Sequence, residues 1–256
     1  MSILSQYHNH CLTLRLHRPE KKNALTLAMY TELTVSLKRA QHDETVRAVL
    51  ITGSGQVFTS GNDLEELQRD PPKRSASPLL HFLEQLMLFP KPLVAMVDGY
   101  AMGIGTSMLL HCDLVYATPR ARFQFPFTQL GLVPEAASSY LLPQLVGYPR
   151  AAELLLLSEP FDAEAALSMG MINKVVAPDL LNAYVEAKLD ALVRLPSASV
   201  QQSKYLLKSA QLPQVRKQME RETRIFLERL KSAEAAEALL AFFEKRKPDF
   251  GKLPSR

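Results

Sequence analysis

The sequence lacks segments that would direct the chain to a membrane or an export pathway. Its first twenty residues show neither the basic-then-apolar pattern of a secretory signal nor the Arg-rich, acid-poor pattern of a transit peptide. No apolar run approaches the length that spans a bilayer, and the C-terminal LPSR is not the S-K-L peroxisomal address. We therefore expect a soluble cytoplasmic protein that does not act at a membrane.

Cysteine and histidine are too sparse for a disulfide framework or a metal centre. Cys11 and Cys112 are the two cysteines, and they stand far apart in apolar contexts. The six histidines form no metal-ligand spacing with Cys, Asp or Glu. We expect reduced thiols, no bound metal, and structural or surface roles for the histidines.

Common catalytic and nucleic-acid-binding signatures are also missing. A dinucleotide fingerprint beginning at Gly103 would need a glycine at position 108, which is Met108. The segment TGSGQ at 52–56 does not fit G-x-S-x-G, and no Ser/His/Asp arrangement is detectable. The net charge of +4 comes without a dense basic–aromatic stretch, so it favours a polyphosphate ligand over nucleic acid.

Strand-like and helix-like segments alternate up to about residue 137. Residues 11–17 alternate apolar and polar, typical of a half-exposed strand, and 93–97 is uniformly apolar, typical of a strand covered on both faces. The remaining expected strands are 46–52, 57–60 and 113–117, and the expected helices are 27–41, 64–70 and 79–88. This alternation predicts βαβ units in an α/β fold.

Beyond residue 137 the pattern is almost wholly helical, with one strand-like piece at 173–176. Helical periodicity covers 200–207, 215–230 and 233–245. No repeat, low-complexity segment or long linker separates these parts. We expect an α/β core over residues 1–195 and a helical C-terminal region over residues 196–256.

Two turns that follow strands offer backbone N–H groups. Gly103-Ile104-Gly105 precedes an apolar helix start, whose first N–H groups have no intrahelical partners. Such groups can bind a developing oxyanion, although glycines there equally permit close packing. The sequence Ser60-Gly61-Asn62-Asp63 is typical of a turn, and Asn62 or Asp63 can cap the next helix.

Glu135 is an isolated carboxylate in strongly apolar surroundings. It follows Pro134, and several phenylalanines and leucines precede it, among them Phe125, Phe127 and Leu132. Proline at the first helical position with an acid behind it is an ordinary helix start. A buried carboxylate would instead have a raised pKa and could shuttle a proton. These residues alone leave both interpretations open.

Seven segments, taken together and in order, resemble the crotonase superfamily, also called the enoyl-CoA hydratase/isomerase family. The resemblance covers nearly the whole chain. The segments are HRPEKKNALT, VFTSGNDL, KPLVAMVDGYAMGIG, CDLVYAT, LGLVPEAASSYLLPQLVG, DAEAALSMGMINKVV and EALLAFFEKRKPDF.

The resemblance implies a fold, a substrate class and an assembly. The fold would be a spiral of βαβ turns followed by helices that serve as a trimerisation or lid region. The substrate would be an acyl-CoA thioester, so coenzyme A enters with the substrate and no separate cofactor is needed. The assembly would be a homotrimer or a dimer of trimers.

The resemblance also implies site residues. By position in the motifs, the backbone N–H groups of Asn62 and Ile104 would hold the thioester oxygen. The lysine-rich segment 245–247 is either a solvated helix end or a contact for the coenzyme A phosphates. The residues expected at the substrate are Lys22, Ala24, Ser60, Gly61, Asp63, Leu64, Gly103, Phe127, Leu132 and Lys247.

Departures from the family pattern indicate which reaction to expect. Hydratases of the family carry two glutamates, whose matching positions here are Ser107 and Phe127. The run Pro134-Glu135 followed by Ala-Ala-Ser-Ser is similar to the single-base site of Δ3,Δ2-enoyl-CoA isomerases. The resemblance thus implies that Glu135 moves a proton from C2 to C4 of a 3-enoyl-CoA. An unusual hydratase and a catalytically silent acyl-CoA-binding protein are the alternatives.

Overall fold

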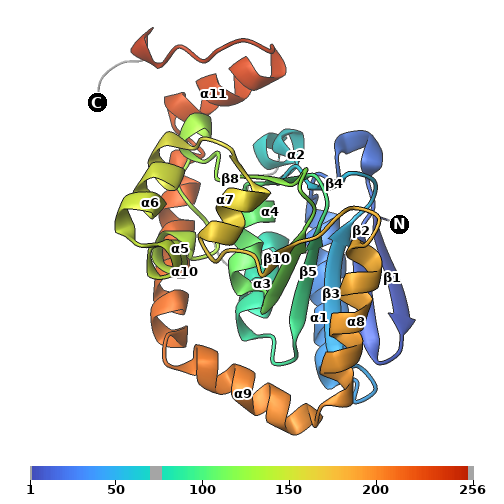
Figure 1. The fold of residues 1–256 in the computed structure, drawn as a ribbon. Helices are drawn as coiled ribbons and strands as arrows, with labels where there is room; N and C mark the ends of the chain where they lie inside the picture. The colour runs from blue at the N-terminus through green and yellow to red at the C-terminus, as the bar shows by residue number, and fades with distance from the viewer. Residues whose placement is uncertain (1, 70–76, 253–256) are drawn as a thin grey trace.

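Figure 1 shows two β-sheets surrounded by helices in the computed structural model, which describes residues 2–69 and 77–252. The larger sheet has six strands in the order β1-β2-β3-β5-β7-β10. β1 and β2 are antiparallel, whereas the other neighbouring pairs are parallel. The strands are β1 Ile3–His8, β2 Cys11–Leu16, β3 Ala48–Gly53, β5 Leu93–Val97, β7 Leu114–Ala117 and β10 Lys174–Val175.

The smaller sheet has four short strands in the order β4-β6-β8-β9. β4 pairs parallel with β6 and β6 parallel with β8, while β9 closes the edge in the antiparallel sense. These strands are β4 Val57–Thr59, β6 Tyr100–Met102, β8 Arg122–Gln124 and β9 Phe161–Asp162.

The helices account for the rest of the regular structure in the described residues. The α-helices are α1 Leu27–His42, α2 Leu64–Arg69, α3 Pro78–Leu88, α4 Ile104–Ser107, α5 Ser138–Val146, α6 Tyr148–Ala152, α7 Ala163–Ser168, α8 Leu181–Arg194, α9 Ser197–Ser209, α10 Leu212–Arg229 and α11 Ala233–Phe243. The remaining short turns of helix are η1 Pro19–Lys21, η2 Met108–His111, η3 Thr128–Leu130, η4 Glu153–Leu157 and η5 Phe250–Lys252.

The chain winds as a spiral that links the two sheets. Strand β3 leads directly into β4, β5 into β6, and β7 into β8, so each pass adds one strand to each sheet before a helix returns the chain. This confirms the expected alternation of strands and helices. The sequence did not indicate a second sheet, because strands of three residues are too short to show a period of two.

Both faces of the larger sheet are covered at its central strands, as the uniformly apolar β5 predicts. All five residues of β5 are buried. Successive residues of β3 face opposite ways, with Leu50 in the cluster that includes Val185 of α8 and Ile51 in the cluster that includes Leu33 of α1. Figure 1 shows α8 on one face of this sheet and α1 and α3 on the other.

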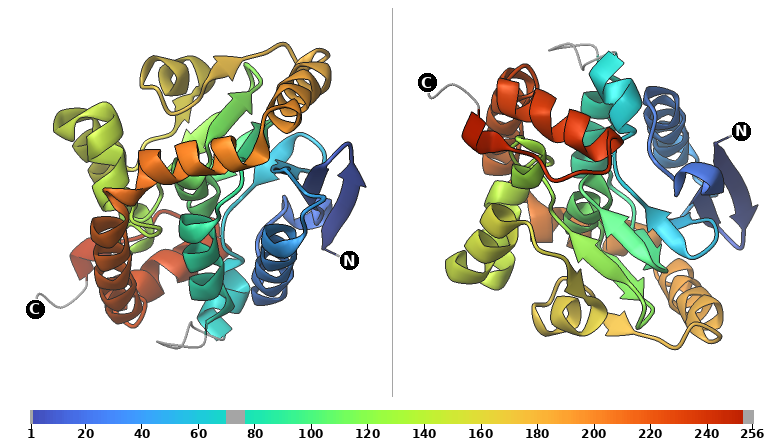
Figure 2. Two further views of the ribbon diagram at one scale, coloured as in Figure 1. Left: turned by 90° about the horizontal axis from the view of Figure 1, so that it is seen from below. Right: turned by 90° about the horizontal axis from the view of Figure 1, so that it is seen from above.

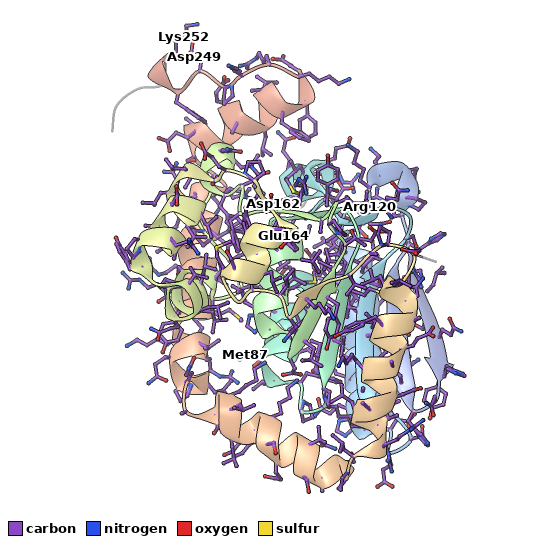
Figure 3. The ribbon with its side chains drawn as sticks, viewed as in Figure 1. Met87, Arg120, Asp162, Glu164, Asp249 and Lys252 are labelled. Carbon is purple, nitrogen blue, oxygen red and sulfur yellow. The ribbon has the colours of Figure 1, made fainter. Side chains whose placement is uncertain are left out.

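The C-terminal helices leave the sheet region. α9 crosses the molecule from α8 to α10, as the left view of Figure 2 shows. α11 and the segment after it form the outer end of the molecule, where Asp249 and Lys252 are labelled in Figure 3. The expectation of a single strand-like piece beyond residue 137 is wrong, because β9 is present as well as β10.

Cys11 and Cys112 are free, and burial raises the pKa of each thiol to about 12. No helix within residues 2–69 and 77–252 is both long enough and apolar enough to cross a membrane.

Candidate active site

Three loops that carry expected site residues meet at one edge of the smaller sheet. Residues 60–63 follow β4, Gly103 follows β6, and the segment 125–137 follows β8. These three strands are parallel neighbours, so their carboxyl ends lie side by side. Ligands of α/β proteins commonly bind outside such carboxyl ends. The topology of the spiral therefore brings together residues more than 70 positions apart in the sequence.

The first two loops fit together only because of glycine. A Cβ on Gly61 would lie 2.8 Å from the carbonyl oxygen of Met102, and its φ of +93° is one that side chains rarely adopt. A Cβ on Gly105 would overlap the side chain of Thr59. The backbones at 59–62 and 102–105 are therefore in direct contact.

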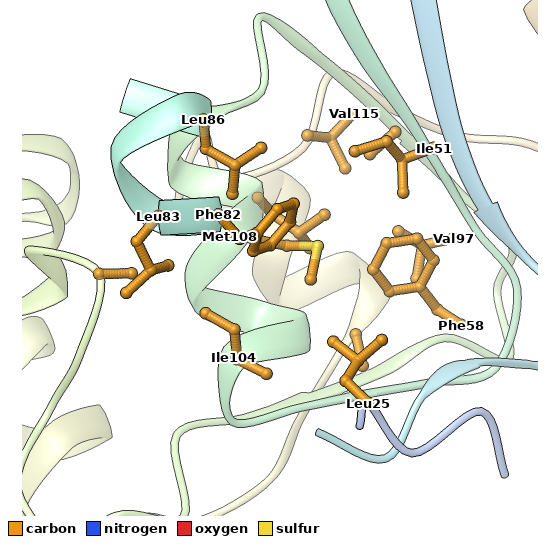
Figure 4. Packing of buried hydrophobic residues seen from close by; sticks show 14 of the residues in the cluster. Leu25, Ile51, Phe58, Phe82, Leu83, Leu86, Val97, Ile104, Met108 and Val115 are labelled. Atoms are coloured by element: carbon orange, nitrogen blue, oxygen red, sulfur yellow. The ribbon is translucent and has the colours of Figure 1, made fainter. Parts of the chain in front are cut away.

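This contact leaves two N–H groups without a protein partner. Across residues 2–69 and 77–252, neither the Asn62 N–H nor the Ile104 N–H donates a hydrogen bond. Ile104 is the first residue of α4, as expected, and its side chain is fully buried. Figure 4 shows that side chain and Met108 packed in the core near Phe82 and Leu25. Packing therefore fixes the direction of the Ile104 N–H.

The turn at 18–25 lies against the Ser60–Asp63 turn. Lys22 accepts a hydrogen bond from the Ser60 N–H at 3.0 Å, and the Leu25 N–H donates to Gly61 at 2.8 Å. Asp63 is paired with Arg18 at 2.6 Å and also accepts from the Glu66 N–H at 3.0 Å. Asp63 therefore caps α2, as expected, and it stabilises the turn. Of the other expected site residues on these turns, Ala24 is buried and Leu64 is half-buried.

Glu135 lies inside the protein and contacts the first loop. Glu135 is 5 % exposed, and its Oε1 accepts a hydrogen bond from the Asn62 side-chain amide at 3.3 Å. The other end of that amide accepts from the Tyr30 hydroxyl at 2.5 Å. Burial raises the pKa of Tyr30 well above its usual value, so the phenol stays a neutral donor. Tyr30 thus orients Asn62 toward Glu135.

The environment of Glu135 changes its acid–base character. Burial is the main cause that raises its pKa to about 8, and the negative charge of Glu222 adds to the rise. The hydrogen bond from Asn62 acts in the opposite direction. A carboxyl group in this state can exchange a proton near neutral pH.

The helix-start interpretation of Glu135 is wrong. α5 begins at Ser138 with Ala137 as its N-cap, so Pro134 is not in the first turn. The Glu135 carbonyl instead accepts from the Ser138 N–H at 3.1 Å and the Ser138 hydroxyl at 2.7 Å. Ser138 therefore supports the helix start, while Glu135 lies in the loop before it.

The two positions that carry glutamates in hydratases of the family contain buried, non-acidic side chains. Phe127 is 3 % exposed and its ring is tilted against that of Phe125, with 6.5 Å between ring centroids. Ser107 is fully buried, and its hydroxyl has no hydrogen-bond partner in the described parts of the chain. Leu132, also expected at the substrate, is buried and its N–H donates to Phe127.

Lys247 lies beyond the end of α11, in the segment at the outer end of the molecule (Figure 1). Its carbonyl accepts from Arg246, which also pairs with Glu237 at 2.5 Å. Within the described residues, no hydrogen bond joins Lys247 to the three loops of the site.

The sequence-based reasoning missed three residues that support the site: Tyr30, His111 and Glu222. Glu222 left a detectable signal, because the buried residues of α10 are Val215, Met219, Glu222 and Phe226. Their spacing is that of an apolar helix face, and one position of that face holds an acid. His111 gave no signal of its own, because its hydrogen bond at 2.8 Å is to the carbonyl of Ala136.

Comparison with known proteins places this arrangement in a family. The profile described as "Enoyl-CoA hydratase/isomerase" matches residues 6–253. The chain belongs to the enoyl-CoA hydratase/isomerase family. A structure described as an enoyl-CoA hydratase/isomerase from Pseudoalteromonas atlantica T6c superposes with a TM-score of 0.93 at 43 % identity, covering 98 % of this chain and 100 % of that one. The expected crotonase-type α/β fold is thereby confirmed.

Relatives of known name within this family differ in their reactions. Enoyl-CoA delta isomerase 2 of Rattus norvegicus is 36 % identical over 91 % of this chain. The chain spans 61 % of the length of that relative. The 2,3-dehydroadipyl-CoA hydratase of Escherichia coli K12 is 31 % identical over 93 % of this chain and 94 % of its own length. The similarity to delta isomerases agrees with the expected branch of the family.

Proposed function

We propose that this member of the enoyl-CoA hydratase/isomerase family is a Δ3,Δ2-enoyl-CoA isomerase. The observation that carries the proposal is the buried carboxyl group of Glu135 at the meeting point of the three loops, which contacts Asn62 and has a pKa raised to about 8. Serine and phenylalanine occupy the positions of the two hydratase glutamates. A site without the hydratase pair of glutamates, in which Glu135 is the base, suits a proton shift better than the addition of water.

In the proposed mechanism, the Asn62 and Ile104 N–H groups donate to the thioester oxygen of a 3-enoyl-CoA. Glu135 takes a proton from C2, and the electron pair of that C–H bond moves into a dienolate whose charge the two donors stabilise. The same carboxyl group then returns the proton to C4, so the double bond ends between C2 and C3. Nothing is consumed, and Glu135 finishes ionised as it began.

The surroundings of Glu135 suit each step. A desolvated carboxylate is a stronger base than one in water, because burial destabilises its charged form. The buried side chains of Phe125, Phe127 and Leu132 would keep water from the dienolate. The Asn62 amide supports the carboxylate form while leaving the second carboxyl oxygen for the substrate.

Coenzyme A would lie along the turns at 18–25 and 60–63. Lys22, Ala24, Ser60 and Gly61 would line the path of coenzyme A, because their turns pack against each other beside the Asn62 N–H. The Lys247 segment would meet its phosphates. We also propose a homotrimer or dimer of trimers in the cytoplasm, supported by strongly exposed apolar side chains on α9, such as Leu206 and Leu207.

The test is incubation of the purified protein with 3-hexenoyl-CoA, following formation of the conjugated 2-enoyl thioester. Glu135→Gln keeps the side-chain shape and removes the base, so turnover should fall by about 10²- to 10⁴-fold. The matched control is Glu164→Gln on α7, an exposed residue labelled in Figure 3, which should keep wild-type turnover.

Three results would overturn the proposal. Comparable conversion of crotonyl-CoA to 3-hydroxybutyryl-CoA would indicate a hydratase. Binding of acyl-CoA without any product would indicate a silent acyl-CoA-binding protein. Unchanged turnover in Glu135→Gln would remove Glu135 as the base.

A further inference from the structure

The loop that carries Glu135 has an unusual backbone. Ala136 and Ala137 follow Glu135 with φ angles of +61° and +55°. A residue other than glycine in the left-handed region costs about 1 kcal/mol or more. Two consecutive alanines in this region therefore need other contacts to hold them, and both are buried at 0–1 % exposure.

The carboxylate of Glu222 makes those contacts from α10. One of its oxygens accepts from the Ala137 N–H at 2.6 Å, and the other from the Ser139 N–H at 2.9 Å and the Ser139 hydroxyl at 2.5 Å. Gln218, one turn earlier on α10, donates to the same hydroxyl at 2.7 Å. Charge-assisted hydrogen bonds of this kind are about twice as strong as neutral ones.

Packing alone does not account for an acid at this position. Glu222 is 4 % exposed and shares its helix face with Met219 and Phe226, so an apolar side chain would fill the space. No Lys, Arg or His of the described residues forms a salt bridge with it. Burying an ionisable group without a cation is costly unless its hydrogen bonds compensate.

Among the described residues, Glu135 and Glu222 are the two acids at the Glu135 loop, and the other titratable groups that face it are His111, Lys208 and Tyr30. Burial raises the pKa of Glu222 to about 7, and hydrogen bonds from Ser139 and Ala137 oppose that rise. His111 contributes a neutral ring, because burial and then the charge of Lys208 lower its pKa to about 4. Lys208 itself donates to the His111 carbonyl at 3.1 Å, and Tyr30 faces Glu135 as a neutral phenol.

We propose that Glu222 is a positioning residue for Glu135. Its carboxylate holds Ala136 and Ala137 in the left-handed conformation that directs Glu135 at Asn62, and its negative charge strengthens Glu135 as a base. The role of Glu135 in this inference rests on the proposed function, whereas the contacts of Glu222 do not.

The first experiment measures the ionisation of Glu135 without any substrate. Protein labelled with ¹³C at the glutamate carboxyl carbon is titrated by NMR, and Glu135→Gln assigns the Glu135 signal. In Glu222→Gln the midpoint of that signal should move to lower pH by about one unit, because a like charge has been removed. Glu220→Gln, an exposed glutamate two residues earlier on the same helix, should leave the midpoint in place. An unchanged midpoint in Glu222→Gln would overturn the inference.

The second experiment separates positioning from general support of the fold. Glu222→Gln places an NH₂ group against one of the two loop N–H groups, so the loop should lose its conformation. We expect kcat for 3-hexenoyl-CoA to fall at least tenfold, with KM within threefold and the thermal midpoint preserved, and Glu222→Asp should recover part of kcat. Equal losses of kcat in Glu222→Gln and Glu220→Gln, or a rise in KM alone, would contradict the positioning role of Glu222. If the wild type shows no isomerase turnover, the proposed function fails, and the NMR midpoint still decides the role of Glu222.

Discussion

The two turns that offer N–H groups and the loop that carries Glu135 are built in different ways. The turns at 59–63 and 102–105 hold each other by backbone contact, which Gly61 and Gly105 permit. The loop at 133–139 is held by side chains from elsewhere, chiefly Glu222, which lies more than 80 residues later. The first region is stabilised locally, and the second depends on the C-terminal helices.

This difference explains why the two regions have different acid–base properties. Backbone donors have no titratable proton, so their function depends only on geometry. Glu135 depends on geometry and on its pKa, and burial and the charge of Glu222 set that pKa. Changes at the turns should therefore alter rate at every pH, whereas changes around the loop should also alter pH dependence.

Among the changes that test how the two regions are held in place, the largest effect is expected at the turns. In Gly61→Ala the new Cβ would approach the Met102 carbonyl to 2.8 Å and displace the Asn62 N–H. We expect kcat/KM for 3-hexenoyl-CoA to fall by about 10²-fold or more, the loss typical of a missing oxyanion donor. Gly55→Ala is the control, because Gly55 also has positive φ, at +69°, but no atom lies within 4 Å of a Cβ there. Equal activity of Gly61→Ala and Gly55→Ala would contradict the view that backbone contact at Gly61 places the Asn62 N–H.

The next effect is a change in stability caused by Glu135 on the 133–139 loop. Because the pKa of Glu135 is about 8 in the folded protein and 4.5 without the fold, wild-type stability should fall as pH rises from 4.5 through 8. Glu135→Gln removes this loss, so its free energy of unfolding should exceed that of the wild type by roughly 5 kcal/mol at pH 9, because the pKa difference of about 3.5 units is multiplied by about 1.4 kcal/mol per unit. Urea denaturation should show that the difference vanishes near pH 4.5. A difference independent of pH would contradict the assignment.

A smaller effect is expected where the two regions meet. Tyr30→Phe removes the hydroxyl that orients Asn62 and leaves the Asn62 carbonyl without that donor. We expect kcat to fall about tenfold, equivalent to roughly 1.4 kcal/mol. Tyr116→Phe, which alters a buried tyrosine of the larger sheet, should keep wild-type kcat in the same assay. A normal rate in Tyr30→Phe would show that Glu135 alone fixes Asn62.

The smallest effect concerns His111, which donates to the Ala136 carbonyl. Its pKa is about 4 in the folded protein against 6.5 ordinarily, so the stability it contributes is present above pH 6.5 and lost as pH falls toward 4. His111→Gln keeps a donor and cannot titrate. Between pH 7 and 4.5, its unfolding free energy should drop by on the order of 1 kcal/mol less than that of the wild type. The exposed His81→Gln should follow the wild type.

Sequence reasoning was most accurate where a motif acts through its own backbone. The strand 93–97, the helix beginning after Gly103 and the Asp63 cap were all predicted, because apolar runs, glycines and capping acids act within a few residues. The smaller sheet was not predicted, since β6 and β8 are three residues each. Glu135 was identified as a candidate, but its residues alone also suited a helix start.

The sequence by itself determined the positions that only glycine can occupy and the family to which the chain belongs. The tertiary structure decided the acid–base chemistry. A glycine requirement is a property of one point on the backbone, so the residue at that point reveals it. The pKa and direction of a carboxyl group depend on burial, hydrogen bonds and charges from other segments. Here Asn62, oriented by Tyr30, donates the hydrogen bond and Glu222 supplies the charge, and only the fold brings them to Glu135.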